Sequence, residues 1–304
     1  MLSRILYGLM GIMAALSLLI HTLTLGLFLY LLIILRLIVF VQRAKDAIQP
    51  AIVEIARLWI GGILWWMNHL QDIHWDIECP LELNRESWYL VTANHQSWAD
   101  IFVLFQVFHR RIPLLKFFIK KEMVRVPVVG QAWWALDFPF MQRHSKAYLE
   151  KFPEKAGQDL VATRKACEKF SQSPTSVMNF LEGTRFTKAK HGQQKSPYRH
   201  LLKPKAGGIA FTIQALGNRF SALTNTTIVY PDGAPSFWDL MCGRLKRVVV
   251  RIESQPIPKH FTQGDYLNDT PFREEVQQWV GDLWQAKDDL IDQVLQQGAE
   301  RPPV

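Results

Sequence analysis

The chain has 304 residues, of which 49% are hydrophobic and 20% are charged, so it can bury a sizeable core and disorder is not expected. Its formal charge of +8 favours an anionic partner, whether nucleic acid, an anionic membrane surface or an acidic substrate. Three distant cysteines without CxxC spacing suggest neither a disulfide framework nor a zinc site. The sequence also lacks the GxSxG, Walker A, GxGxxG and HExxH strings, which argues against the common hydrolase, NTPase, dinucleotide-binding and zincin classes.

The N-terminal segment is strongly apolar. Ile5–Leu35 holds 31 residues without a formal charge, more than the apolar stripe of a soluble helix. As one helix it would be roughly 46 Å long, against a hydrocarbon core of about 30 Å. The polar cluster His21–Gly26 would divide it into Ile5–Ile20 and Leu25–Val41. We expect a two-helix hairpin or one tilted span, with the rest of the chain on the cytoplasmic side, where basic residues are more numerous.

Beyond this segment, helix-like and strand-like patterns alternate. Apolar residues at three- and four-residue steps predict an amphipathic helix over residues 46–72, lying on the bilayer or against the next domain. Later elements predict an α/β fold, a mixed sheet with helices on both faces. We expect strands at Trp88–Ala93, Leu114–Ile119, Leu136–Phe140, Val177–Leu181, Thr226–Tyr230 and Arg247–Glu253, helices at Ile101–Phe108, Ser145–Phe170, Gly207–Leu216 and from Thr270, and an exposed basic loop at 187–205.

Two histidine–carboxylate pairs share one spacing. His-x4-Asp occurs at His95/Asp100 and at His260/Asp265, whereas nine histidines and 14 aspartates predict about 0.4 such pairs by chance. Spacing alone is therefore weak, and context separates them. His95 follows an apolar strand, where open α/β sheets place ligand sites, whereas His260 lies in a loop-like stretch. A neutral imidazole can remove a proton from an alcohol, and a nearby carboxylate fixes its tautomer, so His95 and Asp100 are the candidate catalytic pair.

A second constellation follows another apolar run. The residues Phe180-Leu181-Glu182-Gly183-Thr184-Arg185 combine a glycine, a hydroxyl and a guanidinium, which suit a phosphate group. The alternative is an ordinary tight turn with a surface Glu–Arg pair. The string EGTR would arise by chance in such a chain at a frequency on the order of 10⁻³, so it is specific.

With Asn94-His95-Gln96-Ser97-Trp98-Ala99-Asp100 and the Phe180–Arg185 block in this order, the chain resembles the glycerophospholipid acyltransferase family of the PlsC type. That family shares an NHxxxxD block and an FPEGTR block. The stretch Leu201–Lys205 with two nearby glycines also resembles the branch of lysocardiolipin and lysophosphatidate acyltransferases. Leu181 stands where the family has proline, and Tyr230-Pro231-Asp232 matches the family's later V-P block only loosely.

The resemblance implies O-acyl transfer in a membrane-associated enzyme. His95 would act as general base on a lysophospholipid hydroxyl, with Asp100 orienting it, and acyl-CoA or acyl carrier protein would supply the thioester. The most direct reaction is 1-acylglycerol-3-phosphate to phosphatidic acid, without a covalent acyl-enzyme, metal or cofactor. The implied acceptor-binding residues are Glu182, Gly183, Thr184 and Arg185, and Arg143 in a second block, Phe140–Arg143.

These expectations divide the chain into three parts: a membrane-embedded hairpin or tilted span (1–45), an amphipathic helix and connector (46–80), and an acyltransferase α/β domain (81–304). The expected location is the cell inner (cytoplasmic) membrane, with the catalytic domain facing the cytoplasm. Other lysolipid acceptors, of the lysocardiolipin or lysophosphatidylglycerol type, and a non-enzymatic adaptor for anionic membranes remain alternatives. Acyl hydrolysis is disfavoured because no serine elbow is present. Nucleic-acid binding is least favoured, because an apolar anchor suits lipid better.

Overall fold

A computed structural model describes residues 2–141, 170 and 173–299. Its centre is a mixed six-stranded sheet in the order β1-β8-β7-β2-β6-β3. The β7–β8 pair is antiparallel and the other neighbouring pairs are parallel, so β1 and β8 run opposite to the other four strands; β4 pairs with β5 apart from this sheet. The strands are β1 (His74–Glu78), β2 (Trp88–Ala93), β3 (Leu115–Phe117), β4 (Ile119–Lys120), β5 (Phe140–Met141), β6 (Ser176–Phe180), β7 (Phe220–Val229) and β8 (Arg247–Gln255).

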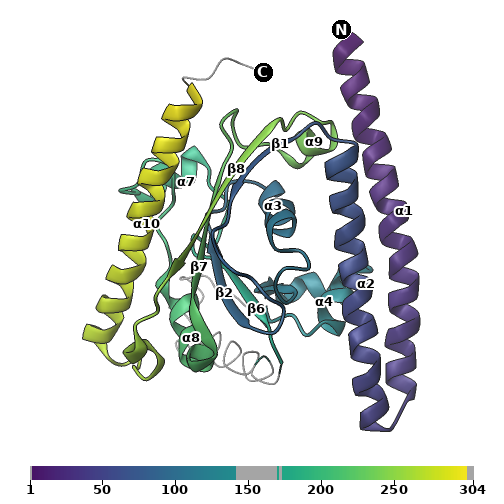
Figure 1. Ribbon diagram of the computed structural model, residues 1–304, viewed down its shortest axis with the longest axis horizontal. Helices are drawn as coiled ribbons and strands as arrows, with labels where there is room; N and C mark the ends of the chain where they lie inside the picture. The colour runs from purple at the N-terminus through teal and green to yellow at the C-terminus, as the bar shows by residue number, and fades with distance from the viewer. Residues whose placement is uncertain (1, 142–169, 171–172, 300–304) are drawn as a thin grey trace.

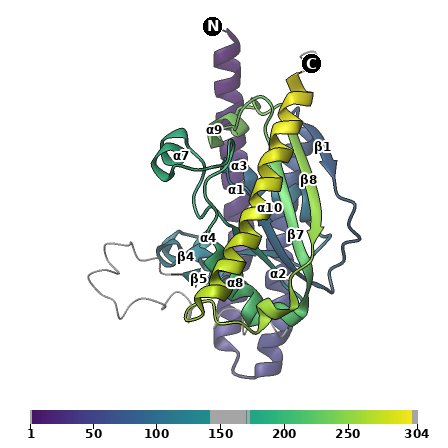
Figure 2. The same ribbon diagram turned by 90° about the vertical axis from the view of Figure 1, so that its left-hand side faces the viewer.

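Helices cover both faces of the sheet, as the alternating pattern predicted (Figure 1). On one face α8 and α10 pack over the strands, and Figure 2 shows α10 crossing β7 and β8. On the other face lie α3, α9 and the N-terminal helices. The α-helices are α1 (Leu2–Ile38), α2 (Gln42–His69), α3 (Ala99–Phe108), α4 (Val129–Ala135), α7 (Lys188–Gln194), α8 (Ala206–Leu216), α9 (Phe237–Met241) and α10 (Thr270–Ala299); 3₁₀ turns occupy Lys121–Arg125, Gly217–Arg219 and Lys259–Thr262.

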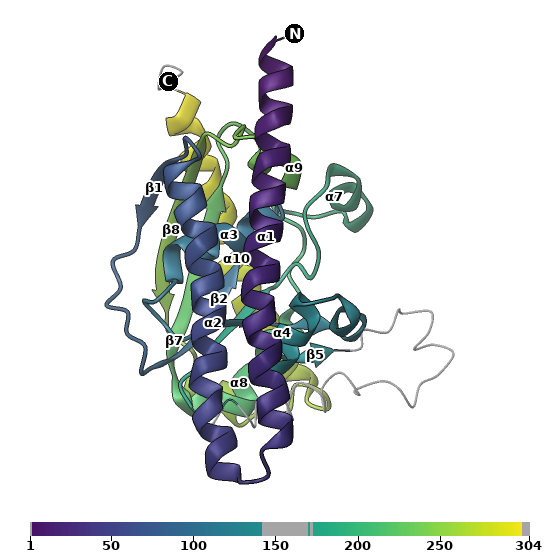
Figure 3. The same cartoon turned by 90° about the vertical axis from the view of Figure 1, so that its right-hand side faces the viewer.

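The sequence left open a two-helix hairpin or one tilted span within residues 1–45, and the structure has a single long helix there. The segment does not break at His21–Gly26 but forms one continuous helix, α1, which packs side by side with α2 (Figure 3). The hairpin is therefore made by α1 together with the segment predicted as a separate amphipathic helix. The polar cluster does not end α1 because it faces α2: the His21 ring bonds the Trp59 carbonyl oxygen at 3.1 Å, and the Trp59 indole donates to the Thr22 hydroxyl at 3.0 Å.

Both hairpin helices are long and apolar enough to cross a membrane, by length and composition. Large apolar side chains of α1 are exposed along its whole length, as at Met13 and Leu27. Only a narrow strip of α1 is buried, including Ala14 and Leu29. A surface of this kind is stable against lipid and unfavourable in water, so the hairpin is suited to membrane association.

Three further expectations about elements need correction. Residues 187–205 are not an exposed loop, because they contain α7 and the fully buried Leu201 and Leu202. In the expected strand Leu136–Phe140, Leu136 caps α4 and only Phe140 enters a strand. The sheet also begins at His74, before residue 81, because β1 pairs with β8. The predicted helix Ser145–Phe170 lies outside the described residues except for Phe170.

Candidate active site

Three neighbouring parallel strands bring the site together. In the sheet β2 lies between β7 and β6, and Ala93 at the end of β2 is in register with Phe180 of β6 and Thr226 of β7. Because parallel strands end at the same edge, the residues that follow them meet there. His95 follows β2, Glu182 follows β6 and Tyr230 follows β7.

His95 and Asp100 form a close pair, as their spacing and context predicted. Nδ1 of His95 lies 2.8 Å from Oδ2 of Asp100, which stands fully buried in the first turn of α3. The His95 ring stacks on the Phe180 ring with centroids 4.0 Å apart. Within the described parts of the chain, no hydrogen bond involves Nε2 of His95, and the residue lines a cavity. The pair therefore has the arrangement of a general base whose carboxylate partner fixes its tautomer.

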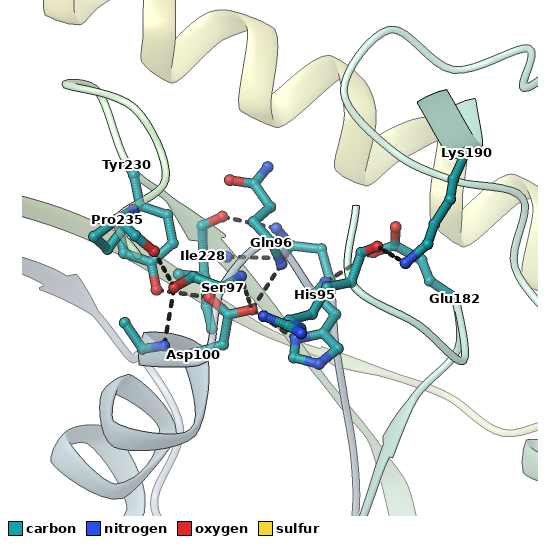
Figure 4. A network of polar contacts seen from close by, with 12 residues as sticks. His95, Gln96, Ser97, Asp100, Glu182, Lys190, Ile228, Tyr230 and Pro235 are labelled. Atoms are coloured by element: carbon teal, nitrogen blue, oxygen red, sulfur yellow. Dashed lines mark hydrogen bonds and ion pairs between the residues drawn. The ribbon is translucent and has the colours of Figure 1, made fainter. Parts of the chain in front are cut away.

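The Asp100 carboxylate receives four donors (Figure 4). Besides His95, the backbone N–H groups of Gln96 and Ser97 donate to Oδ2, at 2.7 and 2.9 Å. The Tyr230 hydroxyl donates to Oδ1 at 2.6 Å. These donors hold the carboxylate in place beside the His95 ring.

Glu182 links the two motif blocks through backbone hydrogen bonds. Its Oε1 accepts the backbone N–H of His95 at 2.8 Å and its Oε2 accepts that of Leu202 at 3.0 Å. The residue is fully buried and is absent from the cavity lining, unlike Gly183, which follows it. Burial raises the pKa of Glu182 to about 7, although the two backbone donors favour its charged form. Glu182 is thus placed to hold the His95 backbone.

The rest of the EGTR block faces the cavity. Gly183 adopts a φ of 68°, a left-handed conformation that favours glycine. The Lys190 side chain reaches back from α7 to donate to the Thr184 hydroxyl at 2.7 Å and to the Arg185 carbonyl oxygen at 3.0 Å. The Arg185 guanidinium lies 4.7 Å from the centroid of the Trp98 ring. A hydroxyl and an arginine are thereby held at the cavity wall near His95.

The cavity itself is large and mainly apolar, with a volume of about 880 Å³. Its lining includes His95, Trp98 and Arg185. It also includes Leu29 of α1 and Phe138, which belong to a separate apolar cluster. The cavity therefore combines a few polar side chains with a large apolar surface.

Some site residues were not predicted from the sequence. The Asn94 amide clamps the backbone of Ile228, donating to its carbonyl oxygen at 2.8 Å and accepting its N–H at 2.9 Å, which ties the end of β2 to β7. Buried Lys287 of α10 donates to the Thr226 carbonyl oxygen behind the site, and burial lowers its pKa to about 7. Asn94 was visible inside the motif, but nothing in the sequence signalled its partner or that of Lys287.

Two other residues singled out in the sequence are Arg143 and His260. Arg143 lies outside the described residues. His260 is exposed and bonds Glu275 rather than Asp265, whose carboxylate bonds Asn268, so the second His-x4-Asp spacing forms no pair. In the described part of the chain, no group of three or more His, Cys, Asp or Glu side chains could hold a metal ion.

The comparison with known families now decides the class. The model of the family described as Acyltransferase matches residues 76–231, just over half of the chain. This chain belongs to that acyltransferase family. The matched range contains both motif blocks and the ends of β2, β6 and β7.

The individual relatives have low sequence identity to this chain. The chain is 24% identical over 249 residues to 1-acyl-sn-glycerol-3-phosphate acyltransferase delta of Homo sapiens, covering 77% of this chain and 60% of that relative. It is 23% identical over 286 residues to the gamma enzyme of Homo sapiens, covering 85% and 70%. A solved structure of the 1-acyl-sn-glycerophosphate acyltransferase PlsC from Thermotoga maritima aligns over 94% of this chain and 100% of that one, with 15% identity and a TM-score of 0.46.

Proposed function

We propose that this acyltransferase moves a fatty acyl group from a thioester donor to the free hydroxyl of a lysophospholipid, most directly 1-acylglycerol-3-phosphate, giving phosphatidic acid. The observation that carries the proposal is the His95–Asp100 pair, which lies at 2.8 Å on the wall of an apolar cavity that Arg185 also lines. The names of the relatives agree with this substrate class.

The proposed chemistry is one direct transfer. Nε2 of His95 removes the proton from the acceptor hydroxyl while the hydroxyl oxygen attacks the thioester carbonyl carbon. The carbon–sulfur bond then breaks, and the departing thiolate takes the proton from the imidazolium. Asp100 holds His95 through Nδ1 and stabilises the imidazolium between the two proton transfers. No covalent acyl-enzyme and no cofactor are needed.

The EGTR block has two proposed roles. Thr184 and Arg185 line the cavity, so the hydroxyl and the guanidinium would bind the acceptor phosphate, for which arginine offers a planar fork. Gly183 supports the turn that presents them. Glu182, expected from the resemblance to bind the acceptor, acts instead as a positioning residue in this proposal, because both its oxygens accept backbone N–H groups inside the protein.

The interior of the cavity would hold the acyl chain. Its volume of about 880 Å³ lies within the range of ligand sites, and phenylalanines and hairpin residues such as Leu25 and Leu29 line it. Because the same helices carry exposed apolar surface, a lipid chain could pass between bilayer and cavity without crossing water. We propose that the hairpin attaches the protein to the inner membrane with the catalytic domain on the cytoplasmic side, where its acyl thioester donors are found.

A panel of donors and acceptors tests the proposal. Detergent-solubilised protein receives labelled acyl-CoA or acyl carrier protein with lysophosphatidic acid, lysocardiolipin, lysophosphatidylglycerol or no acceptor. We expect labelled phosphatidic acid as the main product. A different labelled phospholipid would move the assignment to another acceptor, and free fatty acid released without acceptor would indicate hydrolysis. An inert protein with every pair would leave the anionic-membrane adaptor as the better account.

A further inference from the structure

The hydroxyl of Tyr230 occupies the one Asp100 oxygen that the histidine does not use. It donates to Oδ1 at 2.6 Å, while His95 bonds Oδ2 (Figure 4). Both side chains of this contact are buried, Asp100 fully and Tyr230 to all but 4% of its surface. Burial, with Asp100 alongside, raises the pKa of Tyr230 well above its ordinary value, so the phenol keeps its proton. Among the described residues, the Tyr230 hydroxyl is the donor to Oδ1.

The fold fixes this contact from both sides. Tyr230 directly follows β7, and two residues earlier the backbone of Ile228 is held by both groups of the Asn94 amide. Farther along the same loop, the Ser97 hydroxyl donates to the Pro235 carbonyl oxygen at 2.5 Å. The loop after β7 is therefore tied to the NHxxxxD block on either side of the tyrosine.

We propose that Tyr230 is a positioning residue for the acyl transfer, acting through Asp100: its hydroxyl fixes the rotation of the carboxylate so that Oδ2 faces Nδ1 of His95. This inference rests on the proposed function. Without the hydroxyl, Oδ1 would be a buried acceptor lacking a donor, and the carboxylate would turn or admit water to satisfy it. A rotated carboxylate would leave the imidazolium without its partner when the proton is transferred.

Tyr230→Phe removes only this hydroxyl and keeps the ring that fills the buried site. A matched control is Tyr89→Phe on β2, because Tyr89 is also buried and its hydroxyl accepts the backbone N–H of Asn84, in a loop, at 2.9 Å. Each variant is assayed for acyl transfer to lysophosphatidic acid. Each is also examined by proton NMR for the downfield Nδ1–H resonance, which is assigned by its disappearance in His95→Ala. The resonance reports the His95–Asp100 hydrogen bond without any turnover.

In Tyr230→Phe we expect kcat to fall about tenfold or more, the size of a hydrogen bond to a charged group. We expect unchanged KM for both substrates and a displaced or broadened Nδ1–H resonance. Tyr89→Phe should match the wild type in each respect. An unaltered resonance in Tyr230→Phe overturns the proposal, whether or not kcat falls, because a fall alone would then be a general structural effect. If the wild type transfers no acyl group, the proposed function fails, and the resonance alone decides whether Tyr230 positions the pair.

Discussion

The backbone N–H of His95 donates to Oε1 of Glu182 at 2.8 Å, so the EGTR block holds the backbone of His95 directly. The two blocks lie 87 positions apart in sequence. They meet because β2 and β6 are adjacent parallel strands that end in register. The second oxygen of Glu182 binds Leu202, which brings the segment after α7 into the same arrangement. The EGTR and NHxxxxD blocks are in this way one structural unit.

The pH dependence of stability should reveal the buried carboxyl group of Glu182. Its pKa is raised in the folded protein, to about 7, so it contributes most below its ordinary value of 4.5, and that contribution is lost as the pH rises through 7. Glu182→Gln cannot ionise. The melting temperature of the wild type minus that of the variant should therefore be larger at pH 5 than at pH 8, as measured by thermal unfolding in detergent.

Lys287 should also make the melting-temperature difference between wild type and Glu182→Gln larger at pH 5 than at pH 8. Burial lowers its pKa to about 7, and Glu182 opposes that shift. Without the carboxylate its pKa should fall further, so that burying its charge at pH 5 destabilises the variant more. If the melting temperature of the wild type minus that of the variant were larger at pH 8 than at pH 5, Glu182 would not be a buried group with a raised pKa.

Lys190 should matter for acceptor binding, because it braces the wall formed by Thr184 and Arg185. Lys190→Met removes both donations and should raise KM for lysophosphatidic acid severalfold, with a smaller change in kcat. The control is Lys188→Met, on the same helix and exposed, which should behave as the wild type. Equal KM values in the two variants would show that the brace is unimportant.

Arg185 should distinguish acceptors by their phosphate. We expect Arg185→Gln to raise KM for lysophosphatidic acid about tenfold or more, since hydrogen bonds between charged groups are lost. With a monoacylglycerol, which has no phosphate, wild type and variant should have the same KM. The steady-state kinetics of both proteins with both acceptors check this, and an equal loss with the two acceptors would place Arg185 elsewhere in the mechanism.

Filling the apolar cavity should shorten the preferred acyl chain. Ala56 of α2 lines the cavity and packs against the apolar cluster that contains Leu29. Ala56→Phe should therefore reduce transfer of long acyl chains much more than that of short ones, measured with acyl-CoA donors of increasing length. The substitution Ala189→Phe on exposed α7 provides the control. A uniform loss over all lengths would argue against an acyl chain in this cavity.

The sequence could predict most strands of the central sheet, though not β1, and the proximity of His95 and Asp100, because their signals are local. The strand Trp88–Ala93 is a compact apolar run, and a histidine just after it is separated from its carboxylate by one helical turn. Local context also separated His260/Asp265 from His95/Asp100 correctly, since His260 lies in a 3₁₀ turn and bonds Glu275.

The remaining features depend on contacts between distant segments. The polar residues His21 and Thr22 resembled a break in the first helix, but Trp59, 38 positions beyond His21, supplies their partner. The basic segment after Thr187 looked solvated, although its backbone is held by buried Asp288 of α10. No local pattern announces that a tyrosine after β7 will meet Asp100, since the pairing depends on the strand order.

The role of His95 as the base for acyl transfer can be tested against a control in the same chain, the second His-x4-Asp spacing. Wild type, His95→Ala and His260→Ala are given labelled acyl-CoA and lysophosphatidic acid in detergent, after thermal unfolding has shown that all three are folded. We expect labelled phosphatidic acid from the wild type and from His260→Ala, and none above background from His95→Ala. Phosphatidic acid formed by His95→Ala at the rate of the wild type would contradict that role for His95.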